Sequence, residues 1–366
     1  MQKNKTAGMS PISKSKIALW LCILLMIILP VFSRISSAKV RESLTLCYTT
    51  VIPAVFPFMV LSSFLIKLNG HSALGNFFAL PFRFLFGTSP AASCPVALGL
   101  ICGYPIGAST AASLYDKGEI SKKELERLLT FVNNPSPAFV IGGVGLGLFG
   151  SAKLGRLIYL SVLLSAALCG IATRLIYPKD RSKSFGSRAV DLISLPASLT
   201  SALSESAIGM LNVCACVLFF SVPGAMIGDI LSRLGAPHIL KAAVSGFLEI
   251  SGGVKSASEL TSPMIALMMS AFCCSWSGLS VHMQIFSVCR GRGVSFNGYL
   301  ISKLIQSFIS PGILYILLRV NSADIVMGEL VTPTLAADPR LQLPILILFC
   351  LSVLLSVFHR LRHSVI

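Results

Sequence analysis

Long runs of apolar residues alternate with short polar segments along this 366-residue chain. Six runs approach the ~20 residues that a helix needs to cross a bilayer. They cover 17–33, 49–67, 154–177, 206–231, 295–318 and 341–358. Gly, Pro, Ser and Asn interrupt four further apolar stretches, 72–115, 125–150, 235–260 and 262–287. Irregular backbone at membrane depth is tolerated only inside protein or beside a water-filled cavity. These stretches are therefore predicted to form the functional site of the protein.

Composition supports a helical membrane protein with many spans. Hydrophobic residues make up 54% of the chain and charged residues only 12%, too few charges to cover a soluble protein of this size. The net charge of +16 would suggest nucleic acid as a partner in a soluble chain. Here the basic residues lie in short loops between apolar runs, which is the usual topology signal, so no nucleic-acid partner is expected.

Loop charges give an orientation and a division of the chain. The basic loop 178–193 is expected in the cytoplasm, whereas 320–339 carries three acidic residues and no basic one and is expected outside. The basic N-terminus before the first run favours an uncleaved first span over a cleaved signal peptide. Five parts are predicted. They are an N-terminal basic segment with the first transmembrane helix (1–48), a first repeat with flanking helices (49–177) and the cytoplasmic loop (178–193). A second repeat with flanking helices (194–318) and an outside loop with the last transmembrane helix (319–366) follow.

Neither an enzyme nor a metal or cofactor protein is indicated. The eleven cysteines are scattered, mostly inside apolar runs, with no C-x-x-C and no Cys/His cluster of zinc spacing. The chain has no nucleophile elbow, no zinc-protease motif and no phosphate-binding loop. No catalytic residue, cofactor or metal ligand is therefore expected, and any transport depends on a gradient or a partner.

An internal repeat is the most informative feature. The first copy runs GLICGYPIGASTAASLYD (99–116) and then TFVNNPSPAFVIGG (130–143). The second runs FLEISGGVKSASEL (247–260) and then SAFCCSWSGLSVHM (270–283). Each copy has a Gly-containing break, a small-residue helix, a new helix start and a second break. Ser121-x-x-Glu124 is a capping box that marks the helix start in the first copy, and Pro263 follows the cap in the second.

The breaks have a physical use. Proline removes a donor and disfavours helix at the residue before it, so 133–137 (NNPSP) cannot continue a helix. In transporters the freed amides and carbonyls bind substrate and ions near the membrane midplane. A kink that only shapes packing is the alternative, and two matched breaks favour transport over it.

The runs GYPIGA (103–108) and NNPSPAFVIGGVG (133–145), with the charged helix start between them, resemble the YlbJ-type sporulation integral membrane proteins. Members carry paired nucleoside-recognition (Gate) domains, and the resemblance covers roughly 50–310, more loosely in the second copy. It implies an all-α fold of two inverted repeats with re-entrant hairpins and broken helices, similar to concentrative nucleoside transporters. It also implies passage of dipicolinate across the outer forespore membrane of a sporulating cell.

Candidate substrate-binding residues are the polar and glycine positions at the breaks. They are Gly103, Tyr104, Asn133, Asn134, Ser136, Ser251, Gly252, Gly253, Lys255, Ser275 and Ser277. Lys255 either binds an anionic carboxylate or pairs with Glu259, four residues on. His282 is either a proton relay or a hydrogen-bonded structural residue, and Trp276 either stacks on a solute or packs.

Three functions remain open from the sequence. The first is a transporter or facilitator for a small anionic solute, with dipicolinate as the family's candidate. The second is a nucleoside or ion carrier of the same fold, and the third is a non-transporting scaffold for spore-envelope assembly. The expected partners are the solute and membrane lipid, and the sequence leaves open association with a second copy or with other spore membrane proteins.

Overall fold

The computed structural model describes residues 11–177 and 194–321, and every regular element in these ranges is a helix. The predicted all-α class is therefore confirmed for the described residues. The elements of the first part are α1 (Pro11–Val31), α2 (Ser33–Leu46), η1 (Cys47–Val51), α3 (Ile52–Lys67), α4 (His71–Phe86), α5 (Pro90–Cys102), α6 (Ile106–Asp116), α7 (Lys122–Leu129), η2 (Ala138–Leu148) and α8 (Ala152–Ile176). Those of the second are α9 (Leu195–Arg233), α10 (His238–Leu248), α11 (Ile250–Ser258), α12 (Pro263–Trp276), α13 (Gly278–Val288) and α14 (Asn297–Val320).

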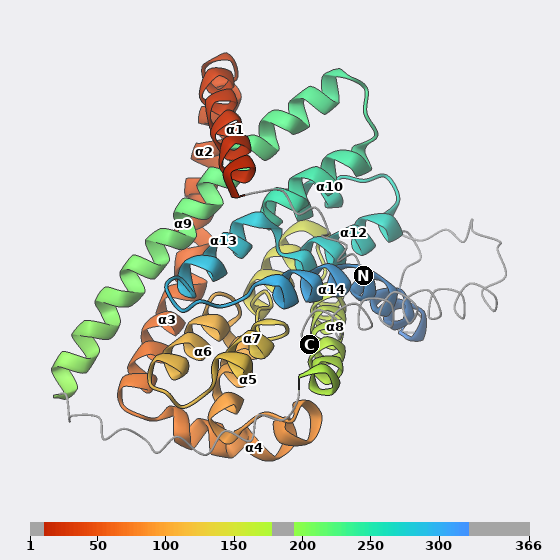
Figure 1. Ribbon diagram of the computed structural model, residues 1–366. Helices are drawn as coiled ribbons and strands as arrows, with labels where there is room; N and C mark the ends of the chain where they lie inside the picture. The colour runs from red at the N-terminus through yellow and green to blue at the C-terminus, as the bar shows by residue number, and fades with distance from the viewer. Residues whose placement is uncertain (1–10, 178–193, 322–366) are drawn as a thin grey trace, which may run out of the picture.

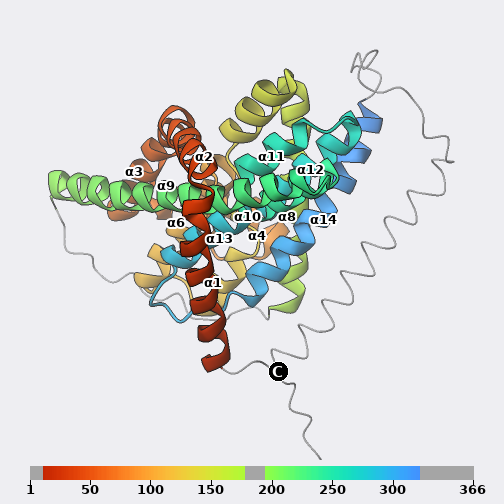
Figure 2. The ribbon, with the colours of Figure 1, turned by 90° about the horizontal axis from the view of Figure 1, so that it is seen from above.

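Five helical segments of the described chain are long and apolar enough to cross a membrane. They are Ser33–Lys67, Ala152–Ile176, Leu195–Arg233, Pro263–Val288 and Asn297–Val320. A sixth would be the pair α4 and α5, which bends by 89° at the three residues between the helices. Figure 1 shows α9 along one side of the molecule and α4 at its lower end, and Figure 2 shows the packed body from above.

The predicted run 206–231 falls inside a candidate span, and 154–177 and 295–318 match two others to within two residues. The run 49–67 is the second part of a longer span that begins at Ser33, because α2, the π-helical η1 and α3 are continuous. The expected first span, 17–33, falls mainly in α1, and the described apolar part of this helix is Leu19–Val31. The run 341–358 and the loops 178–193 and 322–339 lie outside the described residues.

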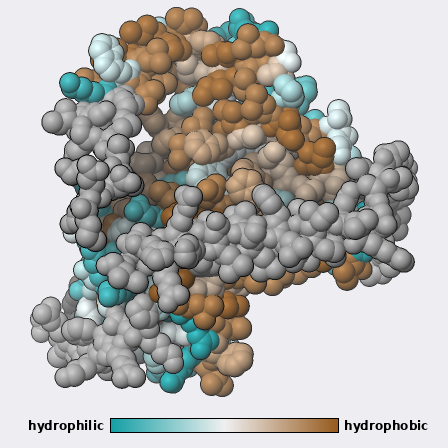
Figure 3. Space-filling model, turned by 45° about the vertical axis from the view of Figure 1, so that its right-hand side comes forward, coloured by the Kyte–Doolittle hydropathy of each residue, from teal (hydrophilic) through white to brown (hydrophobic). Residues whose placement is uncertain are grey.

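Apolar side chains cover much of the described surface. Figure 3 shows large hydrophobic areas on one face, broken by smaller hydrophilic ones. Exposed residues of this kind include Trp20, Phe77, Leu175, Leu211 and Phe308. Water would disfavour so large an apolar surface, whereas lipid chains match it.

The interrupted stretches are indeed broken helices. Ser89 caps α5 by accepting a hydrogen bond from the Ala92 N–H at 3.2 Å, and the helix ends at Gly103, whose φ of +78° suits glycine. The expected capping residue Ser121 accepts from the Glu124 N–H at 3.1 Å and starts α7. The chain is then irregular until η2 begins, as the Asn-Pro-Ser-Pro sequence predicts.

The second copy breaks at single residues. Glu249 separates α10 from α11 with extended backbone, and Ser277 separates α12 from α13 with a φ of +74°. Neither 91–115 nor 238–260 is a straight span, which agrees with the predicted breaks.

Two cores join the copies. One buried cluster packs α5, α6 and α7 against α13 and α14. The other packs η2 and α8 against α11, α12 and α14. Each core therefore mixes elements from both copies, and Tyr104 contacts both cores.

Candidate functional site

In each copy the turn between two short helices, called the tip below, contacts a break between two later helices. The tips are 103–105, between α5 and α6, and Glu249, between α10 and α11. The breaks are 133–137, before η2, and Ser277, between α12 and α13. The backbone N–H of Tyr104, after α5, donates to the Asn134 carbonyl at 2.8 Å. A Cβ at neighbouring Gly103 would lie 2.6 Å from the Ser136 nitrogen. In the second copy, a Cβ at Gly278 would lie 3.0 Å from the Glu249 Cα. The backbones at tip and break are thus in direct contact in both copies.

Glycine pairs bring the short helices together. A Cβ at Gly107 would lie 3.0 Å from the Gly99 Cα, and one at Gly253 would lie 2.2 Å from the Gly246 Cα. The same glycines contact the helix that precedes the break. A Cβ at Gly99 would lie 2.3 Å from the Val132 carbonyl oxygen, and one at Gly246 would lie 2.3 Å from the Cys273 Sγ. Small residues at 99, 107, 246 and 253 therefore hold each tip against its break.

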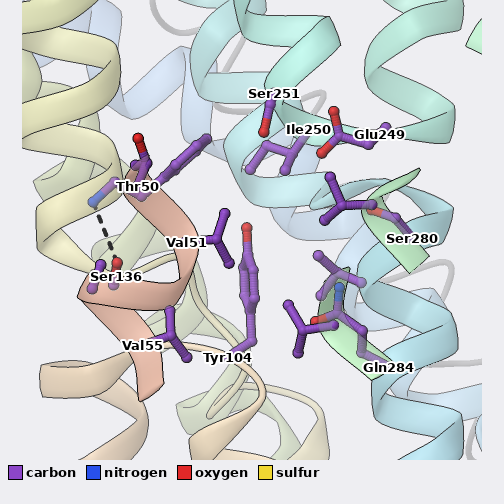
Figure 4. A pocket seen from close by; sticks show the side chains of 15 residues that line it. Thr50, Val51, Val55, Tyr104, Ser136, Glu249, Ile250, Ser251, Ser280 and Gln284 are labelled. Atoms are coloured by element: carbon purple, nitrogen blue, oxygen red, sulfur yellow. Dashed lines mark hydrogen bonds between the residues drawn. The ribbon is translucent and has the colours of Figure 1, made fainter. Parts of the chain in front are cut away.

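A pocket with a cavity volume of about 60 Å³ lies between the two tips. It is lined by residues of η1, α3, α9 and α13 as well as both tips and the first break. Figure 4 shows Tyr104 extending up its middle, with Thr50, Val51 and Ser136 on one side and Glu249, Ser280 and Gln284 on the other. The lining residues are Thr50, Val51, Ala54, Val55, Tyr104, Ser136, Phe139, Val213, Val217, Glu249, Ile250, Ser251, Ser280, Val281 and Gln284.

The pocket combines an apolar wall with a few polar groups, which is the usual build of a small-molecule site. Glu249 is its one acidic lining residue and is buried, with 3% of its surface exposed. Its Oε2 accepts from the Gly252 N–H at 2.8 Å and so caps α11. Its Oε1 has no hydrogen-bond partner, and neither do the Ser280 hydroxyl and the Gln284 carbonyl oxygen. Three polar groups at this wall are therefore left for a ligand or for water.

Three of the residues chosen from sequence line the pocket: Tyr104, Ser136 and Ser251. The Ser136 hydroxyl accepts from the Phe139 N–H at 3.3 Å and starts η2 (Figure 4). The Tyr104 ring contributes aromatic surface at the centre of the cavity. These three residues therefore lie around one pocket at the junction of the two copies.

Other predicted residues lie behind the wall. Asn133 and Asn134 are fully buried, and their side-chain amides donate to the Leu129 and Phe131 carbonyls at 3.1 and 2.8 Å. They satisfy the end of α7, although each Oδ1 has no partner. The Ser277 hydroxyl donates to the Cys274 carbonyl at 3.2 Å, whereas buried Ser275 Oγ is unpartnered.

The glycines chosen from sequence have structural contacts. Gly103 and Gly253 are sites of close backbone approach, and the Gly252 N–H binds Glu249. None of the three lines the pocket. They shape the tips that carry the lining residues.

Lys255 has a partner that the sequence did not suggest. Its Nζ donates to the Glu42 Oε1 at 2.8 Å, so the ion pair reaches α2 and does not involve Glu259. The Lys255 side chain is 52% exposed and does not line the pocket. The sequence suggested Glu259 as the partner because it lies only four residues away. Glu42 is 213 positions away, so spacing along the chain gave no indication of it.

His282 and Trp276 pack together beside the site. The His282 Nδ1 lies 2.7 Å from the Tyr299 hydroxyl, and the Trp276 Nε1 donates to the Phe247 carbonyl at 3.1 Å. Trp276 stacks on Phe247 at 5.4 Å between ring centres. The structure thus gives both residues partners within the protein. No group of three or more His, Cys, Asp or Glu in the described chain is arranged to hold a metal ion.

Sequence reasoning missed Thr50, Ser280 and Gln284 as pocket residues, and it did not select Glu249 as a candidate binding residue. Ser280 and Gln284 are four residues apart on α13 and thus share a helix face, which was a usable signal. Thr50 lies in a continuous apolar run and gave none.

The sporulation integral membrane protein YlbJ of Bacillus subtilis (strain 168) is 26% identical to this chain over 300 residues, which cover 73% of this chain and 73% of that protein. No protein-family model matches the chain, and no solved structure matches it. The chain is thus a distant homologue of YlbJ, as its motifs indicated. With its candidate spans it is a multi-pass integral membrane protein.

Proposed function

We propose that this protein is a sporulation-associated membrane transporter or facilitator that carries a small polar solute through the pocket between its two tips. The two copies would act as inverted repeats, with α5–α6 and α10–α11 as re-entrant hairpins. The observation that carries the proposal is a pocket to which both copies contribute, at the place where each tip contacts a broken helix. Transporters bind their substrates at such repeat interfaces.

The lining chemistry supports solute binding over a purely structural kink. Glu249, Ser280 and Gln284, each with a buried oxygen that has no hydrogen-bond partner, line a mostly apolar cavity. Buried polar groups without partners cost free energy, so a protein retains them where a ligand or water completes them. A kink that served packing alone would have its polar groups paired within the protein.

Dipicolinate is the solute that the family resemblance suggests, and the outer forespore membrane is the corresponding location. Tyr104 offers a ring face for an aromatic solute, and Ser136 and Ser251 offer hydroxyls. A dianion beside an ionised Glu249 would be repelled, so we propose that Glu249 carries a proton when the solute enters. No chemical conversion of the solute is proposed.

A nucleoside carrier is the second candidate, and Glu249 favours it. A free carboxylate oxygen, together with the unpartnered Gln284 carbonyl oxygen, suits the hydroxyl and amine donors of a neutral solute. A membrane scaffold in spore-envelope assembly is the third candidate. For a scaffold, we would expect association with a second copy or with other spore membrane proteins.

Uptake by purified protein in proteoliposomes tests these candidates. Radiolabelled dipicolinate and nucleosides are supplied separately, at neutral and at mildly acidic pH. We expect saturable uptake of dipicolinate that increases at acidic pH. Nucleoside uptake in its place would support the second candidate, and no uptake of any probe would contradict transport.

A matched pair of variants links uptake to the pocket. Ser280→Val places a methyl group in the cavity wall and should block uptake. Ser204→Val makes the same change on an exposed position of α9 and should leave uptake unchanged. Equal uptake by both variants, at equal protein level, would exclude this pocket as the path.

A further inference from the structure

Lys303 lies in the second turn of α14 with no exposed surface. Its Nζ donates to the Gln306 Oε1 at 3.3 Å, and among the described residues it makes no ion pair. Burying an ammonium without an acidic partner costs several kcal/mol. A lysine in this position therefore needs a reason beyond packing.

The buried acidic residue of the described chain is engaged elsewhere, because Glu249 caps α11 and lines the pocket. Other carboxylates bind Lys39, Lys67, His71, Arg233, Lys255 and Arg292. The side chains with which Lys303 interacts electrostatically are Cys169 on α8 and His282 on α13. Neither is acidic enough to serve as an ordinary counter-ion.

Lys303 is linked instead to the end of a broken helix. Gln306, which accepts from Lys303, donates its Nε2 to the Thr130 carbonyl at 2.7 Å. Thr130 directly follows α7, and its carbonyl also accepts from the Ser302 hydroxyl at 2.7 Å. The C-terminal end of a helix carries partial negative charge, which a nearby cation stabilises.

The freed carbonyls at this end are already occupied. Asn133 binds the Leu129 carbonyl, Asn134 binds the Phe131 carbonyl, and α14 binds the Thr130 carbonyl. In carriers driven by Na⁺, carbonyls at the C-terminal ends of broken helices coordinate the ion. Here side chains take those positions, and the Lys303 amine is connected to them through Gln306.

We propose that the Lys303 ammonium is a resident cation, which fills the role of a bound Na⁺ at the end of α7 and makes the protein independent of Na⁺. The transport part of this inference rests on the proposed function. The cation site itself does not, because it concerns the stability of the folded protein.

The first test uses purified protein in detergent and measures the melting temperature in NaCl and in choline chloride at equal ionic strength. The wild-type protein should melt at the same temperature in both salts. Lys303→Ala removes the ammonium and frees the Gln306 Oε1, so Na⁺ should bind there and raise the melting temperature. Lys123→Ala, at an exposed position of α7, is the matched control and should show no difference between the salts.

Stabilisation of the wild-type protein by Na⁺ would overturn the inference, and so would a Lys303→Ala protein that melts equally in both salts. If Lys303→Ala does not fold, Lys303→Met, which also lacks the ammonium but fills more of the buried space, takes its place in the same comparison. In proteoliposomes, wild-type uptake should be the same with Na⁺ or choline outside. Failure of all uptake would reject the proposed function alone, because the melting experiment needs no transport.

Discussion

The two copies of the repeat, called the first and second unit below, each pack a tip against a break, but with different side chains. In the first unit the tip is neutral, and the Tyr104 N–H binds the Asn134 carbonyl across the contact. In the second unit the tip carries Glu249, which caps its own helix and keeps one oxygen free toward the pocket. Both copies therefore close on backbone contacts, and the tip of the second copy adds a carboxyl group. Similar packing thus leaves a carboxyl group at the tip of the second copy and none at the tip of the first.

The glycine contacts offer the largest expected effect. Gly99→Ala would push a methyl group against the Val132 carbonyl oxygen, which is backbone and cannot rotate away. Overpacking of this kind costs about 1–3 kcal/mol or more. We expect a large loss of folded protein, measured as the monodisperse fraction after detergent extraction. Gly142→Ala, with open space around its Cβ position, is the control.

Gly246→Ala should be equally harmful but repairable. Its new methyl group meets the Cys273 Sγ, and the next nearest atoms lie 3.4 Å away. The double variant Gly246→Ala/Cys273→Ala should therefore recover most of the folded protein, whereas Gly99→Ala has no such partner to remove. A double variant as poorly folded as the single one would contradict this difference between the units.

Glu249→Gln tests the charged tip next. The amide keeps an oxygen for the Gly252 N–H, so the helix cap is retained and thermal stability should change little. Uptake should lose its pH dependence, because the group proposed to carry the proton is gone. Tyr104→Phe at the neutral tip should keep that dependence. Unchanged pH dependence in Glu249→Gln would remove Glu249 from the transport cycle.

Asn134→Ala compares the breaks themselves. The Asn134 amide is the donor to the buried Phe131 carbonyl, and leaving such a group unpaired costs about 1–3 kcal/mol. Ser275 at the second break makes no hydrogen bond through its hydroxyl, so Ser275→Ala should cost much less. Thermal melting of both variants measures the difference, and equal losses would show that the breaks depend equally on these side chains.

Lys255→Met should have the smallest effect. An exposed ion pair such as Lys255–Glu42 contributes about 0–1 kcal/mol. Because Lys255 does not line the pocket, uptake of dianionic and neutral solutes should be equally unaffected. A selective loss of dianion uptake would return Lys255 to the substrate path.

Sequence alone located the breaks because their causes are local. Proline at 135 and 137 and glycine at 103 act on neighbouring backbone, so the interruptions could be predicted without partners. The capping box at Ser121 is likewise a contact over three residues. The long apolar runs predicted spans for the same reason, although the start of the second span at Ser33 was missed because 33–46 is too polar.

Tertiary structure decided which polar residues face the pocket. Asn133, Asn134 and Lys255 were chosen for their residue type, yet the first two bind nearby carbonyls and the third binds Glu42. Thr50 and Gln284 lie far apart in sequence and line the same pocket only because their helices pack together. Local chemistry determines where a helix must end, because the backbone responds to its neighbours. The partner of a polar group at such a helix end is determined by contacts between residues that can lie hundreds of positions apart. The periodicity and spacing of residues in the sequence do not reveal those contacts.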